Sequence, residues 1–258
     1  MSEDDTALTA ADWDAATYDR VADPMTRWGA TVLARLALRG DETVVDAGCG
    51  SGRVTEMLLQ RLPAGRVIGI DASATMLAEA ERRLEPAGDR VRLLHADLLE
   101  LTPALLGGTI ADAVLSTATF HWIADHERLF ANLHAVLRPG GQLVAQCGAE
   151  ANIARLLATV RALGVERPGR WNYASVDDTR RRLAAAGFRD IEVWSHPEPT
   201  RFDSADALAE YLETICLRQS VGALPVPERE RVLRGVVAAM PDMTIDYVRL
   251  NMTARRDA

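Results

Sequence analysis

The sequence predicts an α/β protein built on a seven-stranded, mostly parallel sheet with helices on both faces. Short β-branched runs alternate along the chain with longer segments of helical periodicity. A glycine-rich turn joins the first of these runs to the helix that follows it. The chain has 258 residues, which is enough for one such core and a modest additional lobe. This alternation favours parallel strands, because each crossover helix brings the chain back to the edge where the previous strand began.

The first half of the chain contains five of the expected strands. Each is a β-branched run, and proline or glycine ends the helices between them. The strands are expected at residues 43–46, 67–70, 91–94, 111–116 and 142–147. The helices are expected at residues 53–62, 73–84 and 126–137, the second capped by Ser73. A turn at residues 138–141 is expected to lead into the fifth strand.

The second half is richer in helices. Helices are expected at residues 151–163, 178–186, 203–218 and 227–240, and strands at 188–194 and 245–252. Three regions follow from this pattern. They are an N-terminal helical cap segment at residues 1–40, a ligand-binding core at 41–150, and a remainder at 151–258 that completes the sheet and carries lid insertions at about 151–175 and 203–240.

Composition and charge exclude several classes of protein. The net charge of −8 leaves no basic footprint for nucleic acid or an anionic membrane. The three cysteines, Cys49, Cys147 and Cys216, are far apart and indicate neither a disulfide framework nor a metal site. The acidic N-terminus does not resemble a signal peptide, and apolar runs of membrane-spanning length are absent. We therefore expect a cytoplasmic protein without a metal ion, and the sequence leaves the oligomeric state open.

A glycine loop follows the first expected strand, with Gly48, Gly50 and Gly52 just before a helix. Glycine permits a tight turn and close approach of a ligand, and the helix start offers free N–H groups. The loop could be a plain turn or a dinucleotide site, but Arg53 stands where the dinucleotide fingerprint has its third glycine. Asp46, at the end of the strand, suits a cationic ligand group better than a pyrophosphate.

Asp71 ends the second expected strand, nineteen residues after Gly52. An acid at this place can accept both hydroxyls of a ribose. This supports a nucleoside ligand without choosing between a dinucleotide and S-adenosylmethionine (SAM). The alternative is an acid that caps the next helix.

Together these motifs resemble the class I SAM-dependent methyltransferases. The matching segments are residues 44–52, 69–73 with Met76 and Leu77, 96–98, 111–116 and 137–141, and the resemblance is strong over about residues 40–147. It implies a Rossmann-like sheet with an antiparallel last strand, SAM as cofactor and S-adenosylhomocysteine (SAH) as product. Met76 could instead be a core residue, and Asp97 could cap a turn. The cofactor-binding residues implied are Asp46, Ala47, Gly48, Cys49, Gly50, Asp71, Ala72, Met76, Ala96, Asp97, Leu98 and Ser116.

A looser resemblance concerns the acceptor. Residues 13–18, 119–122 and 186–194 are similar to the trans-aconitate methyltransferase group, which methylates carboxylates of small molecules. His121 is the candidate base, although a histidine beside Trp122 can also be a hydrogen-bonded spacer. Tyr18 is expected to gate the site as a second catalytic candidate, and Arg170 could bind a substrate carboxylate. The substrate-binding candidates are Tyr18, Thr117, His121, Trp122, Trp171, Tyr173 and Arg218.

The expected activity is therefore methyl transfer from SAM to a small-molecule acceptor by in-line displacement, to a carboxylate or hydroxyl oxygen. A carboxylate is already ionised at neutral pH and needs no base, whereas an alcohol or phenol benefits from one. The alternatives are a methyltransferase for O, N or C atoms of a non-carboxylate natural product, an NAD-dependent oxidoreductase, and a non-catalytic SAM-binding module. Nucleic acid and membrane partners are not expected.

Overall fold

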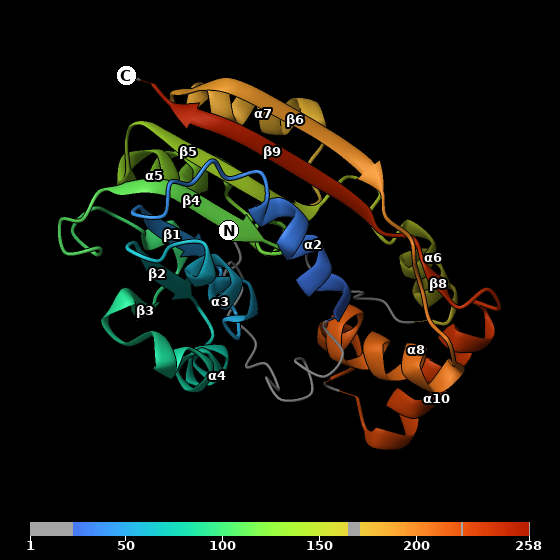
Figure 1. Cartoon of the computed structure of the whole chain (residues 1–258). Helices are drawn as coiled ribbons and strands as arrows, with labels where there is room; N and C mark the ends of the chain where they lie inside the picture. Colours follow the sequence, from blue (N-terminus) through green and yellow to red (C-terminus); the bar gives the residue numbers. More distant parts are fainter. Residues whose placement is uncertain (1–22, 165–170, 223, 258) are drawn as a thin grey trace, which may run out of the picture.

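The computed structural model describes residues 23–164, 171–222 and 224–257 (Figure 1). Its centre is a seven-stranded sheet in the order β3-β2-β1-β4-β5-β9-β6. β9 runs antiparallel to both β5 and β6, and the pairs among β1 to β5 are parallel. The strands are β1 (Thr43–Ala47), β2 (Arg66–Asp71), β3 (Val91–His95), β4 (Ala111–Thr117), β5 (Leu137–Gly148), β6 (Phe188–Pro197) and β9 (Val248–Arg256). The predicted fold class, including the antiparallel last strand, is confirmed.

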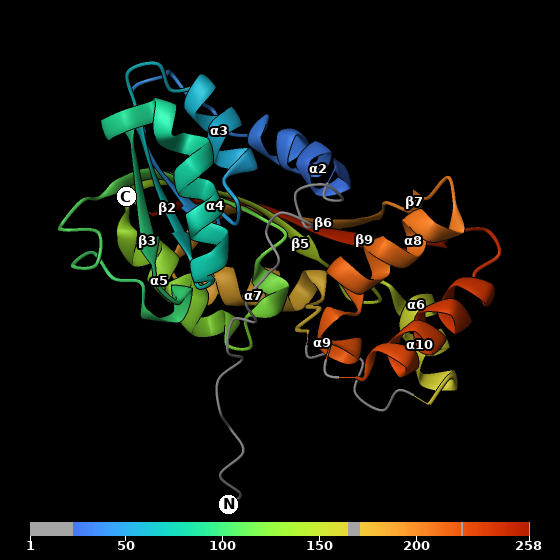
Figure 2. The ribbon, with the colours of Figure 1, turned by 90° about the horizontal axis from the view of Figure 1, so that it is seen from below.

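Helices cover both faces of this sheet (Figure 2). Successive residues of β1 show the two layers, since Val44 belongs to the same apolar cluster as Leu58 of α3 and Val45 to the same cluster as Leu129 of α5. Burial on both faces explains why the strands are continuous apolar runs. One layer contains α2 (Asp23–Leu33), α3 (Arg53–Gln60) and α4 (Ala74–Leu84), and the other contains α5 (His126–Val136) and α7 (Val176–Ala185).

A further group of helices forms a lobe beside the sheet (Figure 2). Its apolar core joins Leu156, Leu208 and Val236 to Trp28 of α2 and Tyr247, which directly precedes β9. This second core positions the lobe next to the carboxyl ends of the parallel strands. Its elements are α6 (Ala154–Ala162), α8 (Ala205–Tyr211), the π-helical segment η4 (Leu212–Cys216), α9 (Arg218–Val221) and α10 (Val226–Ala238).

The structure corrects several predicted boundaries. The last strand, predicted at residues 245–252, starts at Val248 and continues to Arg256, because residues 253–256 pair with β5 on one side and β6 on the other. Residues 244–245 instead form β8 (Thr244–Ile245), which pairs with β7 (Thr200–Arg201) in a separate two-stranded sheet. The predicted turn at 138–141 lies inside β5 as a break in register opposite β4.

Two predicted helices also differ. The helix expected at 203–218 is divided into α8, η4 and α9, and a hydrogen bond from Leu217 N to Leu212 O, five residues back, marks the π-helical turn. The helix expected at 151–163 starts only at Ala154, because Ile153 has a left-handed φ of 51°. No helix in the described ranges is long and apolar enough to cross a membrane.

Candidate functional site

The glycine loop connects β1 to α3 at the carboxyl edge of the sheet. Backbone N–H groups of Gly48 and Cys49 donate to the carbonyl oxygen of Ile70 at 2.8 and 3.0 Å, which fixes the loop against β2. Gly48 and Gly50 have φ values of 83° and 54°, in the region that favours glycine. A Cβ on Gly48 would lie 2.2 Å from Thr119 Oγ1, whereas a Cβ on Gly50 would meet no protein atom within 4 Å. Gly50 therefore leaves open space above the loop.

Asp46 is a buried carboxylate directly below the loop. Its Oδ2 accepts a hydrogen bond from Thr55 Oγ1 at 2.6 Å, while its Oδ1 is buried without a hydrogen-bond partner. Burial and the negative charge of nearby Asp71 raise the pKa of Asp46 to about 6. A buried acceptor that lacks a donor favours a cationic or N–H-bearing ligand group at this place.

Asp71 lies at the end of β2 and links the glycine loop to the start of α4. Its two carboxylate oxygens accept hydrogen bonds from Gly50 N at 2.8 Å and from Ser73 N at 2.9 Å. Burial raises the pKa of this carboxyl, and the backbone hydrogen bonds oppose the rise. Each oxygen retains a lone pair, so the carboxylate could also accept hydroxyl groups of a ligand.

The remaining candidates for cofactor binding differ in which of their groups are available to a ligand. Ser116 donates its hydroxyl to the Ala47 carbonyl at 2.6 Å, so its side chain joins β4 to β1 and only its backbone could face a ligand. Asp97 is exposed and caps the short helix η2 (Leu98–Glu100) by accepting from Leu99 N, which leaves its second oxygen available. Met76 is buried in the first turn of α4, and Ala72 just before this helix is exposed.

Comparisons with known proteins identify the family. The sequence family described as "Methyltransferase domain" matches residues 44–141. A trans-aconitate 2-methyltransferase of Paracidovorax citrulli is 33% identical over 96% of this chain and 99% of that protein. The chain belongs to the class I SAM-dependent methyltransferases. A second trans-aconitate 2-methyltransferase, of Methylobacterium nodulans, is 37% identical over 71% of this methyltransferase and 67% of that protein.

Solved structures agree on the fold of the methyltransferase. The YcgJ protein of Bacillus subtilis superposes with a TM-score of 0.65 at 12% identity over 90% of this chain and 99% of that chain. Haemonchus contortus phosphoethanolamine N-methyltransferase 2, solved with SAH, superposes with a TM-score of 0.62 at 18% identity. That match covers 95% of this chain and 57% of that chain.

The described residues of the methyltransferase fit its cofactor. SAM carries an α-ammonium group, which matches the partnerless oxygen of Asp46, and a ribose, which matches the carboxylate of Asp71. The open space above Gly50 allows the close approach that such a ligand needs. SAM supplies an electrophilic methyl group on a sulfonium when it is bound.

On the acceptor side, His121 lies in the short helix η3 (Phe120–Trp122) and is buried. Its Nδ1 accepts a hydrogen bond from the backbone N–H of Gly148 at 3.3 Å, so the proton of the neutral ring is on Nε2. Burial and the charge of Arg249 lower the pKa of His121 well below its ordinary value. This tautomer makes Nε2 a donor, which argues against the expected role of His121 as a base.

The structure brings four of the expected substrate-binding residues of the methyltransferase together. The ring of His121 lies 5.1 Å from that of Trp122 and is stacked on Tyr173 at 5.8 Å. Trp171 stacks on Tyr173 at 5.8 Å. Thr117 lies at the end of β4, and Arg218 is the first residue of α9 in the helical lobe. Tyr18 and Arg170 lie outside the described residues.

Sequence reasoning missed Arg249 at the start of β9. This residue is 2% exposed, and its guanidinium lies over the ring of Trp28 at 4.4 Å. A charged residue between Val248 and Leu250, inside a predicted strand, was the available signal. It was not informative alone, because strand position does not reveal which side chains surround it.

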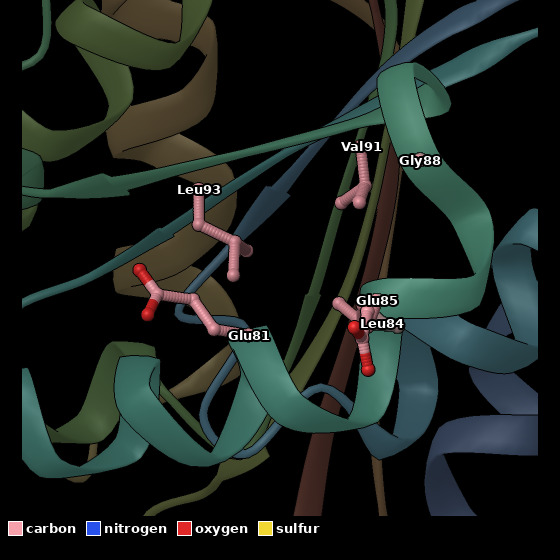
Figure 3. A pocket seen from close by; sticks show the side chains of 6 residues that line it. All are labelled: Glu81, Leu84, Glu85, Gly88, Val91 and Leu93. Carbon is pink, nitrogen blue, oxygen red and sulfur yellow. The ribbon is translucent and has the colours of Figure 1, made fainter.

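A shallow pocket elsewhere does not belong to the site of the methyltransferase. It lies between α4, the helix η1 (Glu85–Arg90) and β3, at the outer edge of the sheet (Figure 3). Its lining includes the first residue of β3, so it is near the amino end of that strand and away from the glycine loop. The residues are Glu81, Leu84, Glu85, Gly88, Val91 and Leu93.

Proposed function

We propose that this methyltransferase transfers the methyl group of SAM to a carboxylate oxygen of a small organic acid. Support comes from relatives named trans-aconitate 2-methyltransferase over nearly the whole chain. The observation that carries the proposal is the tautomer of His121, whose Nδ1 is occupied by the N–H of Gly148. The acceptor side therefore offers a hydrogen-bond donor where a base would be needed for an alcohol or an ammonium group.

The tautomer of His121 favours an acceptor that is already ionised before it binds. A carboxylic acid with a pKa near 4 has lost its proton at neutral pH. Its oxygen attacks the methyl carbon as the bond from that carbon to sulfur breaks, so no proton has to be removed. A neutral Nε2–H of His121 could orient the carboxylate without transferring a proton to it.

The task of the protein is then positioning. Correct alignment of the reacting atoms can lower the barrier by about 7–11 kcal/mol in favourable cases. In our proposal Asp46 and Asp71 orient the cofactor, and the aromatic rings of Trp122, Trp171 and Tyr173 enclose the acceptor and exclude water. In the same proposal the helical lobe and α2 act as the lid over this edge.

The experiment incubates the protein with SAM labelled in its methyl group and a panel of mono-, di- and tricarboxylic acids that includes trans-aconitate. We expect label in a product that releases labelled methanol in mild alkali, because a methyl ester hydrolyses and an ether or a methylamine does not. Label only in alkali-stable products of a cell extract would contradict carboxylate methylation. SAH binding without transfer to any acceptor would support a non-catalytic SAM-binding module.

A further inference from the structure

Arg249 carries a buried charge that nothing in the described chain neutralises. It is 2% exposed, and its Nη2 is buried without a hydrogen-bond partner. Within the described residues, no carboxylate forms an ion pair with it, and burial lowers its pKa. A buried guanidinium without an anion is costly, because its hydration has been lost without replacement. A retained charge of this kind points to a ligand that supplies the missing anion.

The surroundings of Arg249 form a defined aromatic enclosure. The guanidinium lies 4.4 Å from the ring centroid of Trp28 and 6.0 Å from that of Tyr247. The hydroxyl of Tyr247 is 2.8 Å from that of Tyr211, which extends the polar lining into the lobe. These rings come from α2, from the approach to β9 and from α8, so sheet, cap and lobe all meet at one cation.

A chain of hydrogen bonds fixes the direction of the guanidinium. Arg249 Nε donates to Gln146 Oε1 at 3.3 Å, and Gln146 Nε2 donates to Asn251 Oδ1 at 2.9 Å. Arg35 Nη1 donates to the same oxygen of Asn251 at 2.7 Å. Gln146 therefore occupies the Nε side of Arg249 and leaves the Nη side for another acceptor. An Arg fork with free Nη groups is suited to a carboxylate.

The site lies next to the place where the methyl group is expected. Arg249 pairs with Gly148 at the carboxyl end of β5, and the N–H of Gly148 donates to His121. β5 separates β4 from β9, so these two strands are about 10 Å apart at the usual spacing of about 4.8 Å. An acceptor could therefore place one end beside Thr117 of β4 while its other end reaches the long side chain of Arg249.

We propose that Arg249 binds a second carboxylate of the acceptor, so that the enzyme selects di- or tricarboxylic acids and methylates a carboxylate other than the one held by the arginine. This inference rests on the proposed function and adds the residue and the charge requirement that select the substrate. The anion supplies the partner that the buried guanidinium lacks, and the aromatic walls strengthen the contact by excluding water.

The test measures binding and turnover separately. Calorimetry on the SAH-loaded protein uses trans-aconitate, fumarate and crotonate, the last being fumarate with one carboxylate replaced by methyl. We expect wild type to bind the first two at least 100-fold more tightly than crotonate. In Arg249→Met this preference should fall below 10-fold while the Kd for SAH is unchanged. Arg249→Lys should show an intermediate preference, because it keeps the charge and loses the fork.

Arg255→Met is the matched control, since Arg255 is an exposed arginine of the same strand that bonds to the Gly140 carbonyl. It should retain the full preference. Thermal unfolding monitors folding, and Arg249→Lys carries the test if Arg249→Met does not fold. Binding of crotonate as tight as that of fumarate in wild type, or a loss of SAH binding in both Arg249 variants, would overturn the proposal.

The two proposals fail in different ways. Arg249-dependent binding of di- and tricarboxylates without formation of a methyl ester would contradict the proposed function and leave the anion site standing. Methylation of crotonate at the rate of fumarate, with no effect of Arg249→Met, would leave carboxylate methylation standing and remove the anion site. If the protein neither binds nor methylates any of the acids, both proposals are overturned.

Discussion

Thr55 donates its hydroxyl to Oδ2 of Asp46 at 2.6 Å and leaves Oδ1 of the same buried carboxylate without a partner. One carboxylate oxygen is thus hydrogen-bonded within the protein, and the other is left for a ligand. A rise in the pKa of Asp46 from 3.8 to about 6 corresponds to a cost of about 3 kcal/mol for the ionised form. Cofactor binding can recover this free energy when a cation reaches Oδ1.

Asp46→Asn should therefore separate stability from cofactor affinity. The amide removes the buried charge, so we expect the ligand-free protein to keep or increase its free energy of unfolding at pH 7. The Kd for SAH should rise about 10- to 100-fold, as expected for losing a hydrogen bond between charged groups. Denaturant unfolding and calorimetry measure the two quantities. Glu56→Gln, on the exposed face of α3, is the control and should change neither.

The same carboxylate predicts a pH dependence. Between about pH 4 and 6 the folded protein binds a proton at Asp46 that the unfolded chain has lost, so this group makes stability rise as the pH falls from about 7 to 4. SAH affinity should fall over the same range, because protonation removes the charge that attracts the ammonium. The difference between wild type and Asp46→Asn in unfolding at pH 5 and pH 7 isolates this effect. An equal difference at both pH values would contradict it.

A pair of alanine substitutions tests the glycine loop. Gly48→Ala should destabilise the protein, because its Cβ would clash with Thr119 and its φ is positive. Gly50→Ala has the same backbone strain, about 1 kcal/mol, but meets no protein atom, so its main effect should be on SAH affinity. Thermal unfolding and SAH titration of both variants check this. A larger loss of stability in Gly50→Ala than in Gly48→Ala would contradict these different roles of the two glycines.

Much of the fold was predictable because the physics is local. Val44 and Val45 face opposite layers, and a strand buried on both sides is a continuous apolar run that the sequence displays directly. Ser73 was identifiable as a cap, and its Oγ accepts from Met76 N as expected. The end of β9 was predicted too early because Thr253, Arg255 and Arg256 are polar residues that join the strand through pairing with β5 or β6.

The site was predictable only where it is contiguous. Glycine spacing marks the loop because the ligand contacts consecutive backbone groups. Arg249 was missed because its partners come from distant parts of the chain: Trp28 from α2 and Gln146 from β5. The direction in which His121 points its proton also depends on a distant group, the N–H of Gly148. Such relationships exist only after the chain has folded.

His121 gives the most direct test of the chemistry. His121→Asn keeps an acceptor where Nδ1 meets the Gly148 N–H and removes the donor at Nε2. His121→Gln keeps a donor near Nε2 and loses the bond to Gly148. If Nε2–H orients the acceptor, His121→Asn should lower kcat/KM about 10- to 100-fold, about 1.5–3 kcal/mol for a hydrogen bond to a charged group, and His121→Gln should retain more activity.

The pH profile decides between donor and base. Burial holds the pKa of His121 well below 6.5, so the ring is neutral above pH 6 and kcat should be flat from pH 6 to 9 at saturating SAM. His121→Asn should lower this plateau without changing its shape. His134→Asn, on α5 beside Asp257, is the matched control and should behave as wild type. A rise in kcat near pH 7 that disappears in His121→Asn would instead identify His121 as a base and favour an acceptor that must lose a proton.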